Sequence, residues 1–202
     1  SQSSFRMQPL SGDPELVTLF RSGNVAYELC RPLHLYFIWY CRLISQRLVP
    51  TMLSGIPLLI IVFLLPTGFG ATLPVSAGAG AAWMALTFIA LLLSSAISNI
   101  FTISTLWTIA GDGMQMIFQP LAWVFSGILV PLAFFPDGMQ QLLRLLPSSG
   151  IIDIPIRLYT GMIPVSDLLA LGLLQLAWTG IFIIIGLHLL ARAMKRVVVQ
   201  GG

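Results

Sequence analysis

The longest uncharged stretch of this chain runs from Leu48 to Gly111, where 64 consecutive residues include no Asp, Glu, Lys or Arg. A helix needs about 20 apolar residues to cross the roughly 30 Å hydrocarbon core of a bilayer. The stretch is therefore long enough for two crossings and their connection. Only 8% of the 202 residues are charged, against about 25% in a typical soluble domain. This composition excludes a water-soluble domain and predicts one membrane domain over 1–202.

Four membrane-spanning helices are predicted, which together make an all-α polytopic bundle. Apolar runs bounded by proline, glycine or cations place the crossings at 48–65, 78–98, 114–130 and 168–190. Polar residues around Asn99 are expected to mark the inner end of the second crossing, with a protruding or bent continuation. Gly111-Asp112-Gly113 is expected to form a turn, and Asp167 is expected to cap the last crossing.

Two further regions contain helices that are not expected to span the bilayer. Four prolines divide residues 136–164 into apolar pieces too short to cross, which is typical of external re-entrant helices. In the polar region 1–32, the run Asp13-Pro14-Glu15 is typical of a helix start, with a cap, a proline at the first helical position and an acid in the first turn. Aromatic residues and arginines at 33–47 predict an interfacial helix that leads into the first crossing.

The positions of the cations predict the orientation in the membrane. Four crossings bring both ends of the chain to one side, where eight cations lie: Arg6, Arg21, Arg31, Arg42, Arg47, Arg192, Lys195 and Arg196. The opposite side holds Arg144 and Arg157. Because cytoplasmic segments are enriched in Lys and Arg, both termini are predicted to be cytoplasmic. These cations form no stripe interleaved with polar surface, so the net charge of +3 does not indicate a nucleic-acid partner.

The sequence contains no motif of the common catalytic or nucleotide-binding classes. HExxH, GxSxG and P-loop motifs are all absent. The chain is therefore not predicted to be an enzyme or to bind ATP or another cofactor itself. Ten residues separate Cys30 from Cys41, and no Cys/His cluster is present, so we interpret the two cysteines as small buried hydrophobes rather than metal ligands.

Two groups of polar or aromatic residues are candidates for a pathway or gate. Gln115, Gln119 and Trp123 lie in the third predicted crossing, where polar side chains should face protein or a pathway rather than lipid. Asp153 and Arg157 have the i,i+4 spacing of a helical ion pair and are expected on the outer side. Pro155 between them weakens that expectation.

Four segments, in this order, carry a resemblance to a known family. The segment GDPELVTLFRSGNVAYELCRPLHLYFIWYCRLISQRLVPTMLSGIP at 12–57 contains Phe-Arg-Ser-Gly, Tyr-Glu-Leu and Arg-Pro-Leu. The others are SGILVPLAFFPD at 126–137, IPIRLYTGMIP at 154–164 and RVVVQGG at 196–202. Together they resemble the permease subunits of bacterial ABC-2 type exporters over nearly the whole chain. Family members usually have six transmembrane helices, so the resemblance implies that the first two are missing here.

The resemblance implies a transport function with a division of labour between subunits. A separate ABC ATPase would bind ATP and Mg²⁺, and a second permease, identical or related, would pair with this chain in lipid of the bacterial inner membrane. The region 1–32 would be the coupling element that docks on the ATPase. The residues expected to make that contact or to hold its shape are Arg21, Gly23, Glu28, Arg31 and Pro32. The helices at 136–164 would form the outer gate.

Two other classes of function are alternatives to the permease: a membrane scaffold subunit and an integral-membrane enzyme. A membrane scaffold subunit would bury the same helices against partners without forming a route. An integral-membrane enzyme would need polar catalytic groups at membrane depth, which the uncharged stretch argues against. No pattern in the sequence indicates the substrate. The resemblance implies export of a drug, an antibiotic, a peptide or another small molecule.

Overall fold

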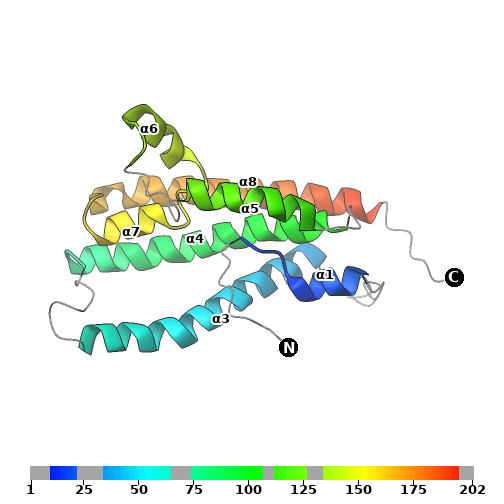
Figure 1. The fold of residues 1–202 in the computed structure, drawn as a ribbon, viewed down its shortest axis with the longest axis horizontal. Coiled ribbons are helices and arrows are strands. Elements are labelled where there is room, and N and C mark those ends of the chain that lie inside the picture. The colour runs from blue at the N-terminus through cyan, green and yellow to red at the C-terminus, as the bar shows by residue number, and fades with distance from the viewer. Residues whose placement is uncertain (1–9, 22–33, 65–73, 107–111, 127–133, 196–202) are drawn as a thin grey trace.

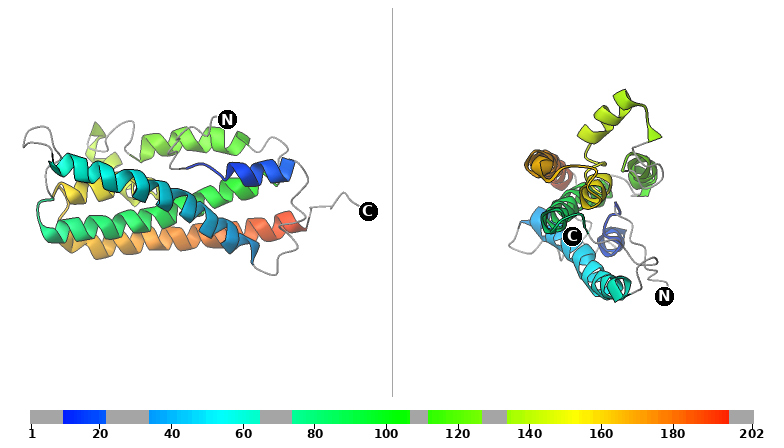
Figure 2. Two further views of the ribbon diagram at one scale, coloured as in Figure 1. Left: turned by 90° about the horizontal axis from the view of Figure 1, so that it is seen from below. Right: turned by 90° about the vertical axis from the view of Figure 1, so that its left-hand side faces the viewer.

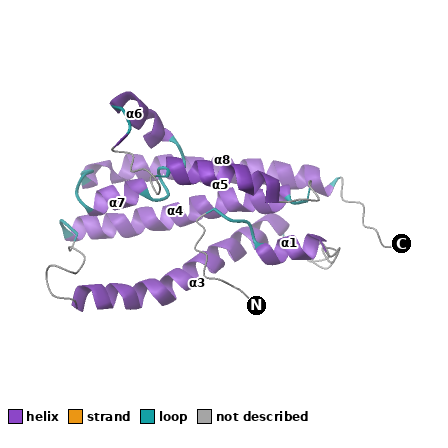
Figure 3. Cartoon of the chain, in the orientation of Figure 1, coloured by secondary structure: helices purple, strands orange, loops and turns teal. Residues whose placement is uncertain are grey.

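The computed structural model describes residues 10–21, 34–64, 74–106, 112–126 and 134–195, and within them every regular element is helical (Figures 1 and 3). The all-α prediction is confirmed for this part of the chain. The elements are α1 (Pro14–Arg21), α3 (Leu35–Leu64), α4 (Ala77–Ser104), α5 (Asp112–Phe125), α6 (Asp137–Leu145), α7 (Asp153–Tyr159), the 3-10 turn η2 (Val165–Asp167) and α8 (Leu168–Met194).

The long helices alternate in direction along one axis. In Figure 1, α3 runs from right to left, α4 returns, α5 runs left again and α8 returns. The beginnings of α3 and α5 and the ends of α4 and α8 therefore lie toward the same end, together with α1. The short α7 lies toward the opposite end, and α6 stands away from the body of the bundle (Figures 1 and 2).

Helix α4 is the centre of the bundle, and α8 packs along its length. Two apolar clusters cover it. Toward the α1 end, Tyr36, Trp39 and Tyr40 of α3 pack with Ala96 and Ile103 of α4 and with neighbours from α1 and α8. Toward the other end, Ala82 and Leu86 of α4 pack against Ile154 and Leu158 of α7. Small side chains on α4 allow these close approaches, because the packing distance of two helices depends on the side chains at their contact.

Two helices in the described part of the chain are long and apolar enough to cross a membrane. These are α4 and the continuous segment Val165–Met194, which combines η2 and α8; their mean hydropathies are 2.0 and 2.3. The apolar part of α4 is 61% buried, as the core helix of a soluble protein would also be, whereas that of α8 is only 17% buried. Exposed apolar residues on α8, such as Leu169 and Leu173, are therefore stronger evidence for contact with lipid or a partner than the buried residues of α4 are.

The observed helix boundaries differ from three expectations. The segments 33–47 and 48–65 join in the single helix α3, which contains both Pro50 and Pro57. Helix α4 continues without interruption beyond residue 98 to Ser104, so the polar residues near Asn99 lie inside it and are buried. Helix α5 begins at Asp112, so Asp112 and Gly113 of the predicted turn are helical, and Gly111 lies outside the described part. Residues 127–130 of the third predicted crossing lie outside the described part.

The expected cap of α8 is also wrong. Asp167 directly precedes α8, but its side chain makes no capping hydrogen bond. Its backbone is already helical, with φ −84° and ψ −6°, because η2 leads into the helix. A capping residue normally has an extended backbone that directs its side chain to the first helical N–H groups. The Asp167 carboxylate instead accepts a hydrogen bond from the Ser166 hydroxyl.

Gly186 permits the close approach of α8 to α3. A Cβ added there would lie 2.5 Å from Cε2 and 3.0 Å from Oη of Tyr36, and Tyr36 is itself buried. We expect Gly186→Ala to lower the free energy of unfolding by about 1–3 kcal/mol, because inserting a methyl into a filled core forces its neighbours to shift. Thermal unfolding in detergent, followed by tryptophan fluorescence, measures this change.

Gly180 provides the matched control on the same helix. No atom lies within 4 Å of a Cβ added there. Gly180→Ala should therefore leave stability unchanged or raise it by up to about 1 kcal/mol, since Ala favours a helix over Gly. Equal melting temperatures for the two variants would contradict the close packing of α8 on Tyr36.

Candidate functional site

The start of α1 is anchored by a carboxylate that has no exposure to solvent. Asp13 Oδ1 accepts hydrogen bonds from the backbone N–H groups of Glu15 at 2.9 Å and Leu16 at 3.3 Å. These bonds cap the helix, so the predicted helix start is confirmed. The Asp13 residue is 0% exposed. A fully buried carboxylate needs more partners than a cap provides, because loss of hydration destabilises its charged form.

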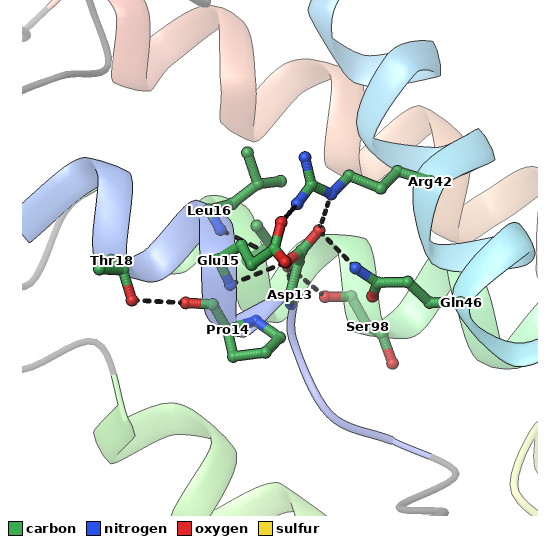
Figure 4. A network of polar contacts seen from close by, with 9 residues as sticks. Asp13, Pro14, Glu15, Leu16, Thr18, Arg42, Gln46 and Ser98 are labelled. Atoms are coloured by element: carbon green, nitrogen blue, oxygen red, sulfur yellow. Dashed lines mark hydrogen bonds and ion pairs between the residues drawn. The ribbon is translucent and has the colours of Figure 1, made fainter. Parts of the chain in front are cut away.

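The second carboxylate oxygen of Asp13 faces α3. Asp13 Oδ2 lies 2.5 Å from Nε of Arg42 and accepts a hydrogen bond of 3.1 Å from Nε2 of Gln46 (Figure 4). Arg42 also pairs with Glu15, whose side chain is largely exposed. Arg42 and Gln46 are four residues apart and so lie on one face of α3. This face holds α1 against α3 through charge-assisted hydrogen bonds, the stronger kind.

Arg47, the next residue on α3, binds α4. Its Nη1 donates to Ser95 Oγ at 3.0 Å, and its Nη2 donates to Ser98 Oγ at 2.6 Å and to the Ser11 carbonyl at 3.3 Å. Burial lowers the pKa of the Arg47 guanidinium to about 10. That value is still far above neutral pH, so the group stays charged. Its partners here are neutral oxygens, and together they replace part of the water that the charge has lost.

Backbone groups of the segment before α1 complete the contact with α4 and α5. The Asp13 N–H donates to the Thr102 hydroxyl at 3.0 Å, and the Gly12 N–H donates to Gln115 Oε1 at 3.4 Å. A Cβ at Gly12 would lie 3.1 Å from Thr102 Oγ1. We call the resulting cluster the Asp13 node, and its members are Asp13, Arg42, Gln46, Arg47, Ser95, Ser98 and Thr102. The node connects α1, α3 and α4, and Gln115 extends it to α5.

The residues predicted to couple to an ATPase lie mostly outside the described part of the chain. These are Gly23, Glu28, Arg31 and Pro32. Arg21 is the last residue of α1. The Asp13 node lies at the start of the same helix.

The residues predicted for a pathway divide into two groups. Gln115 Oε1 accepts from the Gly12 N–H, and Gln115 Nε2 donates to Gln119 Oε1 at 3.4 Å within α5. The indole N–H of Trp123 is buried and has no acceptor among the described residues. Asp153 and Arg157 form the predicted i,i+4 ion pair, at 2.9 Å, within α7. This pair packs beside α4 at the far end of the bundle from the Asp13 node.

Sequence reasoning missed the node as a unit. It assigned Asp13 to a helix cap, Arg42 and Arg47 to membrane orientation, and the polar residues of α4 around Asn99 to the inner end of a crossing. One available signal was the spacing of Arg42 and Gln46, which places two polar groups on one face of an otherwise apolar helix. Another was a run of polar residues in α4, at Ser94, Ser95, Ser98 and Asn99, whose hydrogen-bonding capacity needed partners.

The Asp13 node consists of charged and hydrogen-bonding groups contributed by three helices. No group of three or more His, Cys, Asp or Glu side chains within this part is arranged to hold a metal ion. The Asp13 node contains one buried carboxylate, two guanidinium groups and several neutral hydroxyl or amide groups. Such an arrangement holds helices in register, because separating any pair leaves a buried charge without its partner.

We expect substitutions at Asp13 to separate its two roles. Asp13→Ala loses the cap, worth about 1 kcal/mol, and the charge-assisted bonds to α3, worth about 1.5–3 kcal/mol. The expected loss of unfolding free energy is therefore about 2.5–4 kcal/mol. Asp13→Asn keeps an oxygen for the cap and should lose less. Denaturant unfolding in detergent micelles measures both values.

Glu15→Ala is the control for this series. Its side chain is 75% exposed, and exposed ion pairs contribute less than about 1 kcal/mol. The same assay should therefore detect only a small change. If Asp13→Ala proved no more destabilising than Glu15→Ala, the node would not hold α1 on α3.

Comparison with protein-family models, with curated proteins and with solved structures finds no match to this chain. The resemblance to ABC-2 permeases therefore rests on the residues quoted from the sequence.

Proposed function

We propose that this chain is a membrane-spanning permease subunit of an ATP-binding cassette exporter. The observation that carries the proposal is the Asp13 node, which links the short helix α1 to the long helices α3 and α4 through buried charged groups. A soluble ATPase must transmit force to membrane helices through a rigid element. Helix α1, followed directly by the predicted coupling residues, is such an element.

The node allows α1 to move together with α3 and α4. Breaking the Asp13–Arg42 pair would leave a carboxylate with 0% exposure without its cation, which costs several kcal/mol. Bending a capped helix of eight residues would break its own hydrogen bonds as well. A displacement at the end of α1 is therefore transmitted to α3 and α4 rather than absorbed locally. The two long helices would then shift relative to α8 and open or close a route.

The rest of the proposed assembly follows the resemblance. The chain would cross the bacterial inner membrane four times, with both termini in the cytoplasm. A separate ABC ATPase would bind ATP and Mg²⁺, and it would dock on this chain through Arg21, Gly23, Glu28, Arg31 and Pro32. A second permease would complete the route for a small molecule, drug, peptide or lipid-like substrate. The short helices α6 and α7, at the other end of the bundle from α1, fit an outer gate.

The proposal predicts that damage to the coupling region lowers both substrate-stimulated ATP hydrolysis and export. In the full complex, reconstituted in liposomes with its ATPase, Glu28→Ala and Arg31→Ala should lower substrate-stimulated ATP hydrolysis and export roughly fivefold or more, the size of a typical coupling free energy. Arg47→Lys should act similarly without touching the ATPase, because a lysine cannot contact Ser95, Ser98 and Ser11 in the fork geometry of a guanidinium.

Arg192→Ala is the control, because it removes an exposed cation from the last turn of α8, outside the proposed coupling region and the proposed gate. Its stimulated hydrolysis and export should match those of the unsubstituted complex. Unchanged coupling in all three coupling variants would overturn the proposal. Co-purification of the native chain with partners that include no ATPase would favour the scaffold instead.

A further inference from the structure

An apolar pocket of about 250 Å³ opens between α4, α5 and α8. Its walls include Phe101 of α4, Phe118 and Ala122 of α5, Phe182 of α8 and Ile151 of the turn before α7. Leu10, just before α1, closes it. The pocket therefore collects side chains from five separate parts of the chain, which only the folded bundle brings together.

The pocket has a closed floor and an open mouth. Leu10 and Phe101 are 2% and 6% exposed, whereas Phe118 is 49% exposed. The floor is held by the Asp13 node, since the backbone of the adjoining segment donates from Gly12 and Asp13 to α5 and α4. The wall formed by residues 147–151 is held to α8, because Gln175 Nε2 donates to the Gly150 carbonyl at 3.0 Å. These bonds fix the shape of the pocket before any ligand enters.

The chemistry of the lining selects an uncharged ligand. No ionisable side chain lines the pocket, and Ser148 carries its single polar side chain. A charged ligand would lose its hydration there without gaining a partner. An alkyl group would gain about 25 cal/mol for each Å² of apolar surface that it buries. A dry cavity of about 150 Å³ already admits benzene, so this pocket has room for a somewhat larger apolar group.

We propose that this pocket is a binding site for an uncharged alkyl chain. The chain comes either from a membrane lipid, as the end of an acyl tail, or from a free alkyl molecule, and both share the chemistry that the lining recognises. The site lies within one copy of the chain and needs only the described residues. It therefore does not depend on the permease proposal, and a binding assay without an ATPase tests it separately.

Photo-crosslinking in lipid nanodiscs tests the site. One arm uses decane that carries a diazirine, and the other uses phosphatidylcholine with a diazirine near the end of one acyl chain. Mass spectrometry of the peptides locates the cross-links. We expect saturable labelling, at most one probe per chain, on peptides that contain Phe101, Phe118 or Ile151, and competition by unlabelled decane in the free-alkyl arm. The arm that saturates identifies the source of the alkyl chain.

Matched variants distinguish the pocket from the lipid-facing surface. Ala122→Phe fills the pocket and should lower saturable labelling by about tenfold or more, a loss of about 1.4 kcal/mol. Ile151→Phe fills it from another wall and keeps the test decisive if Ala122→Phe does not fold. Ala177→Phe makes the same change at an exposed position of α8 and should leave labelling unchanged. Labelling that never saturates, or that both filling variants leave intact, would overturn the proposal.

Discussion

Burial of the Asp13 carboxylate is the constraint on which the arrangement of the long helices depends. An ionised carboxylate out of contact with water is stable only if cations and hydrogen-bond donors surround it. Here two backbone N–H groups, Arg42 and Gln46 meet that need, and each donor sits on a different part of α1 or α3. The position of α1 and the rotation of α3 about its axis are thereby determined together. Arg47, one residue further along, then fixes the same helix against α4.

Apolar packing acts on this polar framework but does not replace it. Buried polar groups specify one arrangement, because any other leaves donors or acceptors without partners. Apolar side chains alone are compatible with several arrangements of the helices. Close contacts such as Gly186 against Tyr36 narrow the choice by shape, since the larger residue leaves no room for even a methyl group. Helix α8 depends mainly on shape of this kind, with Gln175 as its buried polar bond to the 147–151 turn.

The sequence predicted what is local and missed what depends on distant pairing. The Asp13-Pro14-Glu15 start of α1 and the Asp153–Arg157 pair were predicted, because both depend on groups within four residues of each other. The Arg47–Ser98 bond joins residues 51 positions apart, and no local pattern specifies it. The cap at Asp167 failed because the preceding 3-10 turn changed the backbone, an effect that propensities for single positions do not capture. The pocket was not predicted, since its lining comes from segments whose contacts only folding establishes.

Leu10 and Asp13 are three residues apart, yet one closes an apolar cavity and the other anchors a charged cluster. The short backbone between them is held at Gly12 and Asp13, so neither end can shift without displacing the other. Thermodynamic linkage then makes the two ends reciprocal. If the native position of Leu10 raises the affinity of the cavity for an occupant, then the occupant stabilises the native position of α1 by the same coupling free energy. A hydrocarbon bound in the cavity would thus make α1 harder to displace from α3 and α4.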